Sequence, residues 1–326
     1  MNDAPTTGAA ASTLGLGGRA SDIATRYAMV GVLALLLVIA VVVYPNFLSV
    51  GNILNVLTNA TPVGLVAIGM TFVLIGGGFD LSVAGIFAAS GVLYATLANV
   101  MPVSLAFLAM LPIALAVGLL NGLIITRLHV NAFVATLGSA SIFTGLAFLI
   151  NTSGAVMVTD SAFTYLGRER WLGIPIMIWI LALAFALGGL VLAKTVYGRK
   201  VYLVGGNADA ARLSGIRVGW IQASTYVLTA VCSALAGMLL ASQTGVGQAN
   251  VGVNITLDAI AIVIIGGTSL RGGQGAMWRT LVGLLIIATI SSVFNSLALN
   301  AAVQSVAKGV IVIAAVALDA WTQRRR

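Results

Sequence analysis

The chain has 326 residues, of which 60% are hydrophobic and 7% are charged, with 16 Lys or Arg against 8 Asp or Glu. A water-soluble domain typically carries about 25% charged residues, so this chain has too little polar surface for water and must be an integral membrane protein. One Cys and one His exclude an intrachain disulfide and a His-based metal site, and the net charge of +8 is scattered between apolar runs, unlike a nucleic-acid-binding surface.

Apolar runs predict ten membrane-spanning helices. A helix needs about 20 apolar residues to cross roughly 30 Å of hydrocarbon, and charged residues, Gly and Pro separate the runs. The predicted spans are residues 28–44, 53–75, 81–98, 103–126, 133–150, 172–194, 220–241, 255–266, 276–293 and 301–320. The eighth is shorter than a full span. The predicted fold class is an all-α polytopic membrane protein with about ten transmembrane helices.

The distribution of Lys and Arg predicts that both termini are cytoplasmic. With the N-terminus inside, thirteen of the 16 basic residues fall on the cytoplasmic side, whereas Arg168 and Arg170 fall on the opposite side. Residues 1–27 are small, polar and Gly-rich, which predicts a disordered cytoplasmic tail, and the first apolar run lacks a small-residue cleavage site and is expected to be retained. Residues 28–322 then form the transmembrane domain, and residues 323–326 form a basic cytoplasmic end.

Two helix ends share a sequence pattern. Residues 73–77 (VLIGG) and 263–267 (VIIGG) match at an offset of 190 residues, and each is followed by a short polar loop and another helix. Such a match indicates an internal repeat, which is common in transporter folds. The alternative is a chance match, because Val, Ile and Gly are frequent throughout the chain.

The longest predicted cytoplasmic loop, residues 195–219, contains a short helix with start and stop signals. Asn207 is suited to N-capping it, residues 208–214 can form about two turns, and Gly215 can take the left-handed conformation that ends a helix. A helix of this length is marginal alone in water, so we expect it to pack against something, which includes another protein. The alternative is a solvated loop.

The sequence has no motif that supplies energy for transport. It contains no G-x-x-x-x-G-K-[ST] loop for ATP phosphates, and its Asp and Glu residues fall in loops or at the ends of predicted spans. If the chain moves a solute, the energy is expected to come from a partner. The alternatives are an ion-coupled secondary transporter of a small polar solute, which would need an intramembrane carboxylate, and a membrane subunit that transports nothing.

Five segments form an ordered set between residues 45 and 320. They are GGGFDLSV (76–83), AFVATLG (132–138), YGR (197–199) with GGNADAARLSGI (205–216), LDAIA (257–261) with IGGTSLRGG (265–273), and KG (308–309). This set resembles the sugar-type permease subunits of bacterial ATP-binding-cassette importers, the family that contains the ribose permease. The chain departs from the usual family pattern at Phe79, Ala84, Ala132 and Arg279, and the first two departures bear on the identity of the solute.

The resemblance implies a non-enzymatic importer subunit in the bacterial inner membrane. Two permease copies, surrounded by lipid, would form the path for a monosaccharide or a similar small polar solute delivered by a periplasmic solute-binding protein. Two ABC ATPase subunits would use ATP and Mg below the membrane, while this chain itself would bind no cofactor, metal or nucleic acid. By the same resemblance, the residues that couple the chain to the ATPase are Asn207, Asp209, Ala211, Arg212, Leu213 and Gly215.

Uncharged polar side chains are candidates for the solute path. A polyol needs hydroxyl and amide partners without a fixed charge that would trap it, and the ninth span offers Ser291, Ser292 and Asn295 at helical spacing. The candidates for the path are Phe79, Asp80, Ser82, Asn121, Thr136 and Asn295. The alternatives are helix packing for Asn121, which lies in a Gly-x-x-x-Gly sequence, and helix capping for Asp80. Pentose, hexose, polyol, nucleoside and a sugar-derived signal all stay open as the solute.

Overall fold

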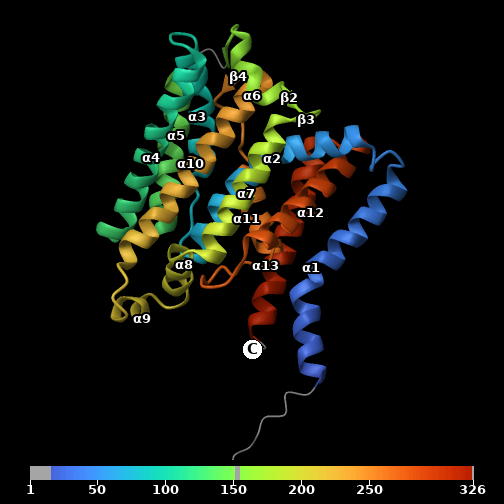
Figure 1. Ribbon diagram of the computed structural model, residues 1–326, viewed down its shortest axis with the longest axis vertical. Helices are drawn as coiled ribbons and strands as arrows, with labels where there is room; N and C mark the ends of the chain where they lie inside the picture. Colours follow the sequence, from blue (N-terminus) through green and yellow to red (C-terminus); the bar gives the residue numbers. More distant parts are fainter. Residues whose placement is uncertain (1–15, 151–154, 325–326) are drawn as a thin grey trace, which may run out of the picture.

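The computed structural model describes residues 16–150 and 155–324, which form mainly long helices lying side by side (Figure 1). Ten helices correspond to the ten predicted spans: α1 (Leu16–Val43), α2 (Val50–Ile75), α3 (Val83–Ala98), α4 (Val103–Arg127), α5 (Ala132–Ile150), α7 (Ile176–Lys194), α10 (Val218–Thr244), α11 (Ile255–Ile265), α12 (Met277–Ser296) and α13 (Ala301–Arg324). Six of them, α2, α4, α5, α7, α10 and α12, are long and apolar enough to cross a membrane, and the other four contain shorter apolar stretches. The predicted all-α polytopic class is confirmed.

Shorter elements connect these helices at the two ends of the molecule. One end carries η1 (Ser161–Thr164), α6 (Tyr165–Arg168) and two antiparallel strand pairs, β1 (Ala155–Met157) with β4 (Val246–Gln248) and β2 (Arg170–Trp171) with β3 (Ile174–Pro175). The other end carries α8 (Val196–Gly206) and α9 (Ala208–Leu213). The described start of α1 and the end of α13 lie at the same end as α9 (Figure 1).

Two helices begin four or more residues away from their predicted starts. The helix α1 begins at Leu16, so residues 16–27 are helical where an irregular tail is predicted; residues 1–15 lie outside the described residues. The helix α7 begins at Ile176 rather than near residue 172, because Leu172 and Gly173 both have positive φ and turn the chain between β2 and β3. Hydropathy alone does not register such a turn.

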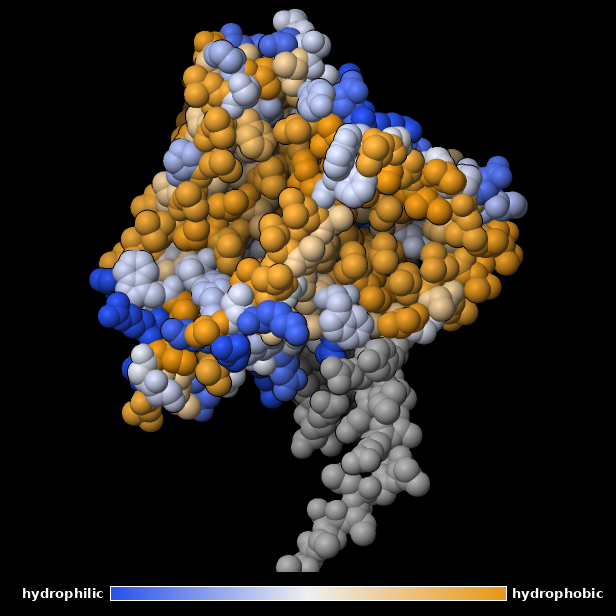
Figure 2. All heavy atoms as spheres, in the orientation of Figure 1, coloured by the Kyte–Doolittle hydropathy of each residue, from blue (hydrophilic) through white to orange (hydrophobic). Residues whose placement is uncertain are grey.

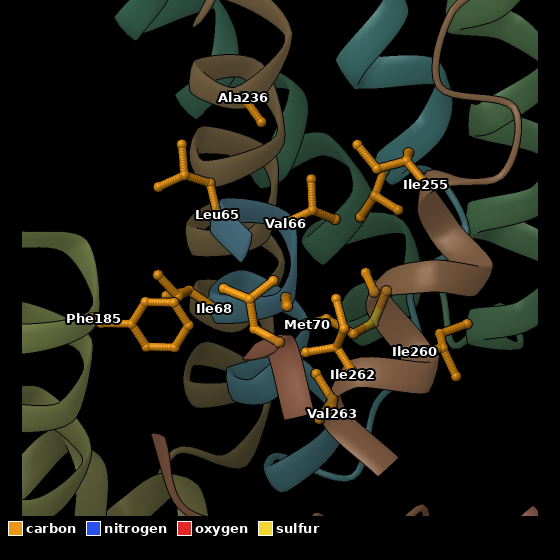
Figure 3. Close-up of a cluster of buried hydrophobic side chains, with 14 of the residues drawn as sticks. Leu65, Val66, Ile68, Met70, Phe185, Ala236, Ile255, Ile260, Ile262 and Val263 are labelled. Carbon is orange, nitrogen blue, oxygen red and sulfur yellow. The ribbon is translucent and has the colours of Figure 1, made fainter. Parts of the chain in front are cut away.

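The helix α2 is the centre of the hydrophobic core. Its residues from Ala60 to Ile75 are all buried except Val63. Most of them belong to a cluster with side chains from α7, α10 and α11 (Figure 3), and the cluster also includes residues of α12. In contrast, fewer than a third of the residues in the apolar windows of α4, α5 and α7 are buried. Apolar side chains therefore cover the outside between two more polar ends (Figure 2), as expected of helices that face lipid.

Small residues bring the central helices into close contact. A β-carbon on Gly118 would lie 2.5 Å from the Cα of Val227, and one on Gly122 would lie 2.8 Å from the Cα of Ala223, so α4 meets α10 backbone to backbone. This close approach confirms the packing interpretation of the Gly-x-x-x-Gly sequence around Asn121.

The two similar helix ends have the same geometry. The N–H groups of Gly76 and Gly266 each donate to a carbonyl four residues earlier, and Gly77 and Gly267 have φ values of 77° and 79°. The N–H groups of residues 78 and 268 then donate to the carbonyls of residues 73 and 263, at 2.9 and 3.1 Å. Both ends are Schellman motifs, which Gly commonly forms after a helix, and the internal repeat stays a prediction.

Candidate functional site

The short helix α9 has the predicted start and stop signals. The Oδ1 atom of Asn207 accepts a hydrogen bond from the N–H of Ala210 at 2.9 Å, as in an N-cap. At the other end Gly215 has a φ of 78°, and the N–H of Ile216 donates to the carbonyl of Ala211 at 3.0 Å. Together these two features form the Schellman ending, which Gly favours because it has no side chain to strain.

The two faces of α9 differ in character. Ala211 is buried in a small cluster with Val204, which holds the helix against the membrane domain. Leu213 is 90% exposed, and Arg212 pairs with Asp209 at 3.1 Å between two largely exposed side chains. An exposed Leu beside exposed charges on a well-capped helix is a surface suited to a protein partner.

A cluster of glycines joins α8 to the ends of the membrane helices. The N–H of Gly273, in the loop between α11 and α12, donates to the carbonyl of Ile75 at 2.8 Å. A β-carbon on Gly272 would lie 2.8 Å from the Cα of Gly77 and 2.7 Å from the carbonyl oxygen of Gly205. We call these glycines with Ile75 the glycine junction; it connects the residues just before α9 to α2 and α12.

A large polar cavity lies between the N-terminal half of α2 and the C-terminal half of α12, away from the glycine junction. Its volume is about 870 Å³, within the range typical of small-molecule sites. Its polar lining residues are Tyr44, Asn52, Asn55, Asn59, Asn250, Asn254, Asp258, Ser291, Ser292, Asn295, Ser296, Gln304 and Lys308. Most of these groups are neutral amides and hydroxyls, which can both donate to and accept from a solute hydroxyl.

One ion pair lies in the wall of this cavity. The Nζ atom of Lys308, on α13, lies 3.0 Å from Oδ2 of Asp258, on α11, and both side chains are about four-fifths buried. The pair brings the eighth and tenth predicted spans into contact. Among the described residues no cluster of three His, Cys, Asp or Glu side chains could hold a metal ion.

Three of the predicted path residues meet in a buried hydrogen-bond network. Asp80 is fully buried, and its Oδ1 atom accepts hydrogen bonds from the N–H and the hydroxyl of Ser82. The hydroxyl of Ser82 accepts from the amide of Asn121 at 2.9 Å, and the Oδ1 of Asn121 accepts from the hydroxyl of Ser139 at 2.6 Å. The network ties the start of α3 to α4 and α5. Asp80 lies just before α3, at the predicted span end, and its carboxylate is buried there.

The remaining path candidates separate into two places. Thr136 lies beside this network and accepts a hydrogen bond from the N–H of Leu81 at 3.0 Å, while Phe79 is partly buried and its carbonyl accepts from the hydroxyl of Tyr226 at 3.4 Å. Asn295 lies in the cavity wall with its ninth-span neighbours. Of the six candidates, only Asn295 is among the described residues that line the cavity.

Sequence reasoning missed most of the cavity wall. Asn52, Asn55 and Asn59 lie at the start of α2, three and four residues apart, and all three line the cavity. This spacing places three amides on one side of an otherwise apolar helix, which is a signal that the sequence does contain. Gln304 was also missed; its amide donates to Oδ1 of Asn295 at 3.0 Å.

Comparisons with known proteins give a consistent result. The family model described as the branched-chain amino acid transport system permease component matches residues 52–316. The chain is 41% identical to a ribose import permease protein of Bacillus subtilis (88% of this chain and 90% of the relative) and 37% identical to one of Haemophilus influenzae (88% and 91%). It is also 35% identical to an L-arabinose transport system permease protein of Escherichia coli, with 92% of each chain covered. No solved structure matches the chain significantly.

Proposed function

The chain belongs to this family of transport-system permeases, and we propose that it is the membrane subunit of an ATP-driven importer for a monosaccharide or a similar small polar solute. Relatives that cover nine-tenths of its length are named for ribose and arabinose, which are neutral polyols. The permease is an inner-membrane protein. The ten-span topology, with both termini in the cytoplasm, follows in this proposal from the thirteen basic residues on that side.

The observation that carries this proposal is the capped helix α9 at the basic end of the molecule. Its Leu213 is almost fully exposed, although α9 itself is held by Ala211 and by the glycine junction. In the proposed importer, the ATPase subunits bind this helix, and nucleotide-driven movement of the ATPase passes through the junction to α2 and α12. ATP and Mg are bound by the ATPase, not by this chain.

The proposed solute path is the cavity lined by Asn52, Asn55, Asn59 and Asn295. A second copy of the permease is expected to complete the path, and a periplasmic binding protein to deliver the solute. Path roles for Phe79, Asp80, Ser82, Asn121 and Thr136 stay predictions, because their hydrogen bonds serve helix packing.

The experiment that tests this function is reconstitution of the full chain in liposomes with its partner ATPase subunits and periplasmic binding protein. We expect uptake of labelled D-ribose or L-arabinose only when ATP, ATPase and binding protein are all present. The ion-coupled alternative has one observation in its favour, since Oδ2 of the buried Asp80 has no hydrogen-bond partner among the described residues. Uptake driven by a proton or sodium gradient without the ATPase would contradict the ATP-driven importer and support the ion-coupled transporter.

A further inference from the structure

The cavity wall contains two charged side chains among its described residues, and they are paired with each other. Asp258 and Lys308 are 20% and 23% exposed, and one carboxylate oxygen lies 3.0 Å from the ammonium nitrogen. Oδ1 of Asp258 has no hydrogen-bond partner in the part of the chain that the structure describes, and the ammonium group has two further N–H groups to donate. The pair can therefore bind a solute and remain intact.

Helix packing alone does not account for this pair. A neutral hydrogen bond from Asn254 to Ser305 already connects the start of α11 to α13, and one from Gln304 to Asn295 connects α13 to α12. A largely buried ion pair is costly in desolvation, and apolar side chains of similar size often stabilise a protein as well or better. Its position at the cavity therefore points to a role in what the cavity accepts.

The charge balance of the cavity depends on both members of the pair. The other polar groups of its wall are amides and hydroxyls, which carry no net charge. If either Asp258 or Lys308 were absent, the remaining partner would leave one uncompensated charge in a partly desolvated space. That charge would attract oppositely charged solutes and repel those of like charge. It would also bind water that a neutral solute has to displace.

We propose that Asp258 and Lys308 form a charge-balancing pair that makes the cavity selective for neutral polyhydroxylated solutes. The pair keeps the net charge of the wall at zero, while the free carboxylate oxygen accepts from one solute hydroxyl and the ammonium group donates to its neighbour. This inference rests on the proposed function, because it treats the cavity as the solute path.

The test measures the charge preference of the cavity directly. Cys232 is the single native cysteine, so a Cys232→Ala background allows Asn55→Cys to report from the cavity wall. We would compare the rates at which anionic sulfonatoethyl and cationic trimethylammonioethyl methanethiosulfonates modify this cysteine in the solubilised full-length protein. Relative to the intact pair, the anionic-to-cationic rate ratio should rise roughly fivefold in Asp258→Asn and fall roughly fivefold in Lys308→Gln. A ratio that is unchanged in both variants, or that moves the same way in both, overturns the proposal.

Two controls keep the result interpretable. Leu213→Cys, on the exposed face of α9, should show a ratio that does not depend on the pair. If the single variants fail to fold, Asp258→Cys and Lys308→Cys carry the test, with each anionic-to-cationic rate ratio divided by that of Leu213→Cys to remove the intrinsic difference between the reagents. The normalised ratio should be above one at position 258 and below one at position 308, and normalised ratios on the same side of one at both positions overturn the proposal.

A measurement with added solute distinguishes failure of this inference from failure of the proposed function. D-Ribose at millimolar concentration should slow modification of Asn55→Cys in the protein with the intact pair, whereas D-glucuronate should do so mainly in Asp258→Asn. Opposite shifts in the reagent ratio without protection by D-ribose would support the charge-balancing pair and contradict the monosaccharide as solute. Protection by D-ribose together with unchanged reagent ratios would contradict the charge-balancing role of the pair but not the monosaccharide as solute.

Discussion

Gly205 and Ile75 meet backbone to backbone, so closely that a methyl group on Gly205 would overlap the carbonyl oxygen of Ile75. That oxygen also accepts the hydrogen bond from Gly273. One carbonyl group at the end of α2 therefore holds both the last turn of α8 and the loop before α12. Because α9 begins two residues after Gly206, a displacement of α9 must either move α2 and α12 or break the contact between Gly205 and Ile75.

Replacing Gly205 with Ala should disrupt the glycine junction. The added methyl group has no space beside Ile75, and overpacking of this kind costs roughly 1–3 kcal/mol of unfolding free energy. Thermal unfolding of the purified protein should show a clearly lower Tm. Gly206→Ala is the matched control, since its β-carbon would approach nothing closer than 3.9 Å, and its Tm should stay near that of the native protein. Equal Tm values for the two variants would contradict the junction.

Replacing Gly215 with Val should weaken binding of the ATPase. A β-carbon at residue 215 meets no atom within 4 Å, so the strain comes only from the φ of 78° and amounts to about 1–2 kcal/mol. We expect normal membrane insertion and elution volume, but reduced capture of the ATPase subunit on pull-down. Gly215→Asn, which tolerates this conformation, should retain more ATPase than Gly215→Val. Full capture of the ATPase subunit by Gly215→Val would show that the loop of residues 195–219 is a solvated connector rather than a docking site.

The exposed side chains of α9 allow docking to be tested without disturbing the fold. Leu213 is 90% exposed, so Leu213→Ser should change the unfolding free energy by less than about 0.5 kcal/mol. If α9 binds the ATPase, this variant and Arg212→Glu should both lower ATPase capture and substrate-stimulated hydrolysis, whereas Leu213→Met should preserve them. Unaltered hydrolysis in both Leu213→Ser and Arg212→Glu would show that α9 is not part of an interface with the ATPase.

Asp80 allows a comparison between capping and transport. Asp80→Asn keeps an oxygen that can accept from Ser82, while Asp80→Ala leaves the buried N–H of Ser82 without that partner, a loss of about 1–3 kcal/mol. We therefore expect Asp80→Ala to lower the yield of folded protein and Asp80→Asn to lower transport more than yield. Normal transport by Asp80→Asn would leave Asp80 with a capping role alone.

The sidedness of the molecule can be read from two exposed positions. In a Cys232→Ala background, Leu213→Cys should be protected from an impermeant maleimide in right-side-out vesicles, and Ser161→Cys should be labelled. Labelling of both cysteines from the outside would contradict the ten-span topology, in which α7 crosses the membrane between them.

Local features of the site were predictable, and its long-range contacts were not. The cap at Asn207 and the turn at Gly215 depend on residues within one helical turn, so the sequence contains their full signal. The pair between Asp258 and Lys308 joins residues 50 positions apart, and no periodicity indicates which helices touch. With 38 glycines in the chain, composition also gives no way to find the few that meet at the glycine junction.

The fold shows the same division. Ten apolar runs become ten helices because a helix satisfies its own backbone hydrogen bonds in apolar surroundings, whatever its neighbours are. The cavity depends instead on how the polar side of α2 is placed relative to α12, which follows from tertiary packing. Asn52 and Asn59 were therefore visible in the sequence as polar residues, but not as members of one wall with Asn295.

The glycine junction also sets an order of events during synthesis. Ile75, Gly205 and Gly273 leave the ribosome in that sequence, so the contact between them cannot close until the loop before α12 has been made. Until then α9 has the support of the Ala211 cluster but lacks that of the glycine junction, although its own sequence is already complete. If α9 binds the ATPase as proposed, a nascent permease presents it fully seated only after most of the membrane domain has been translated, which disfavours recruitment of the ATPase by truncated chains.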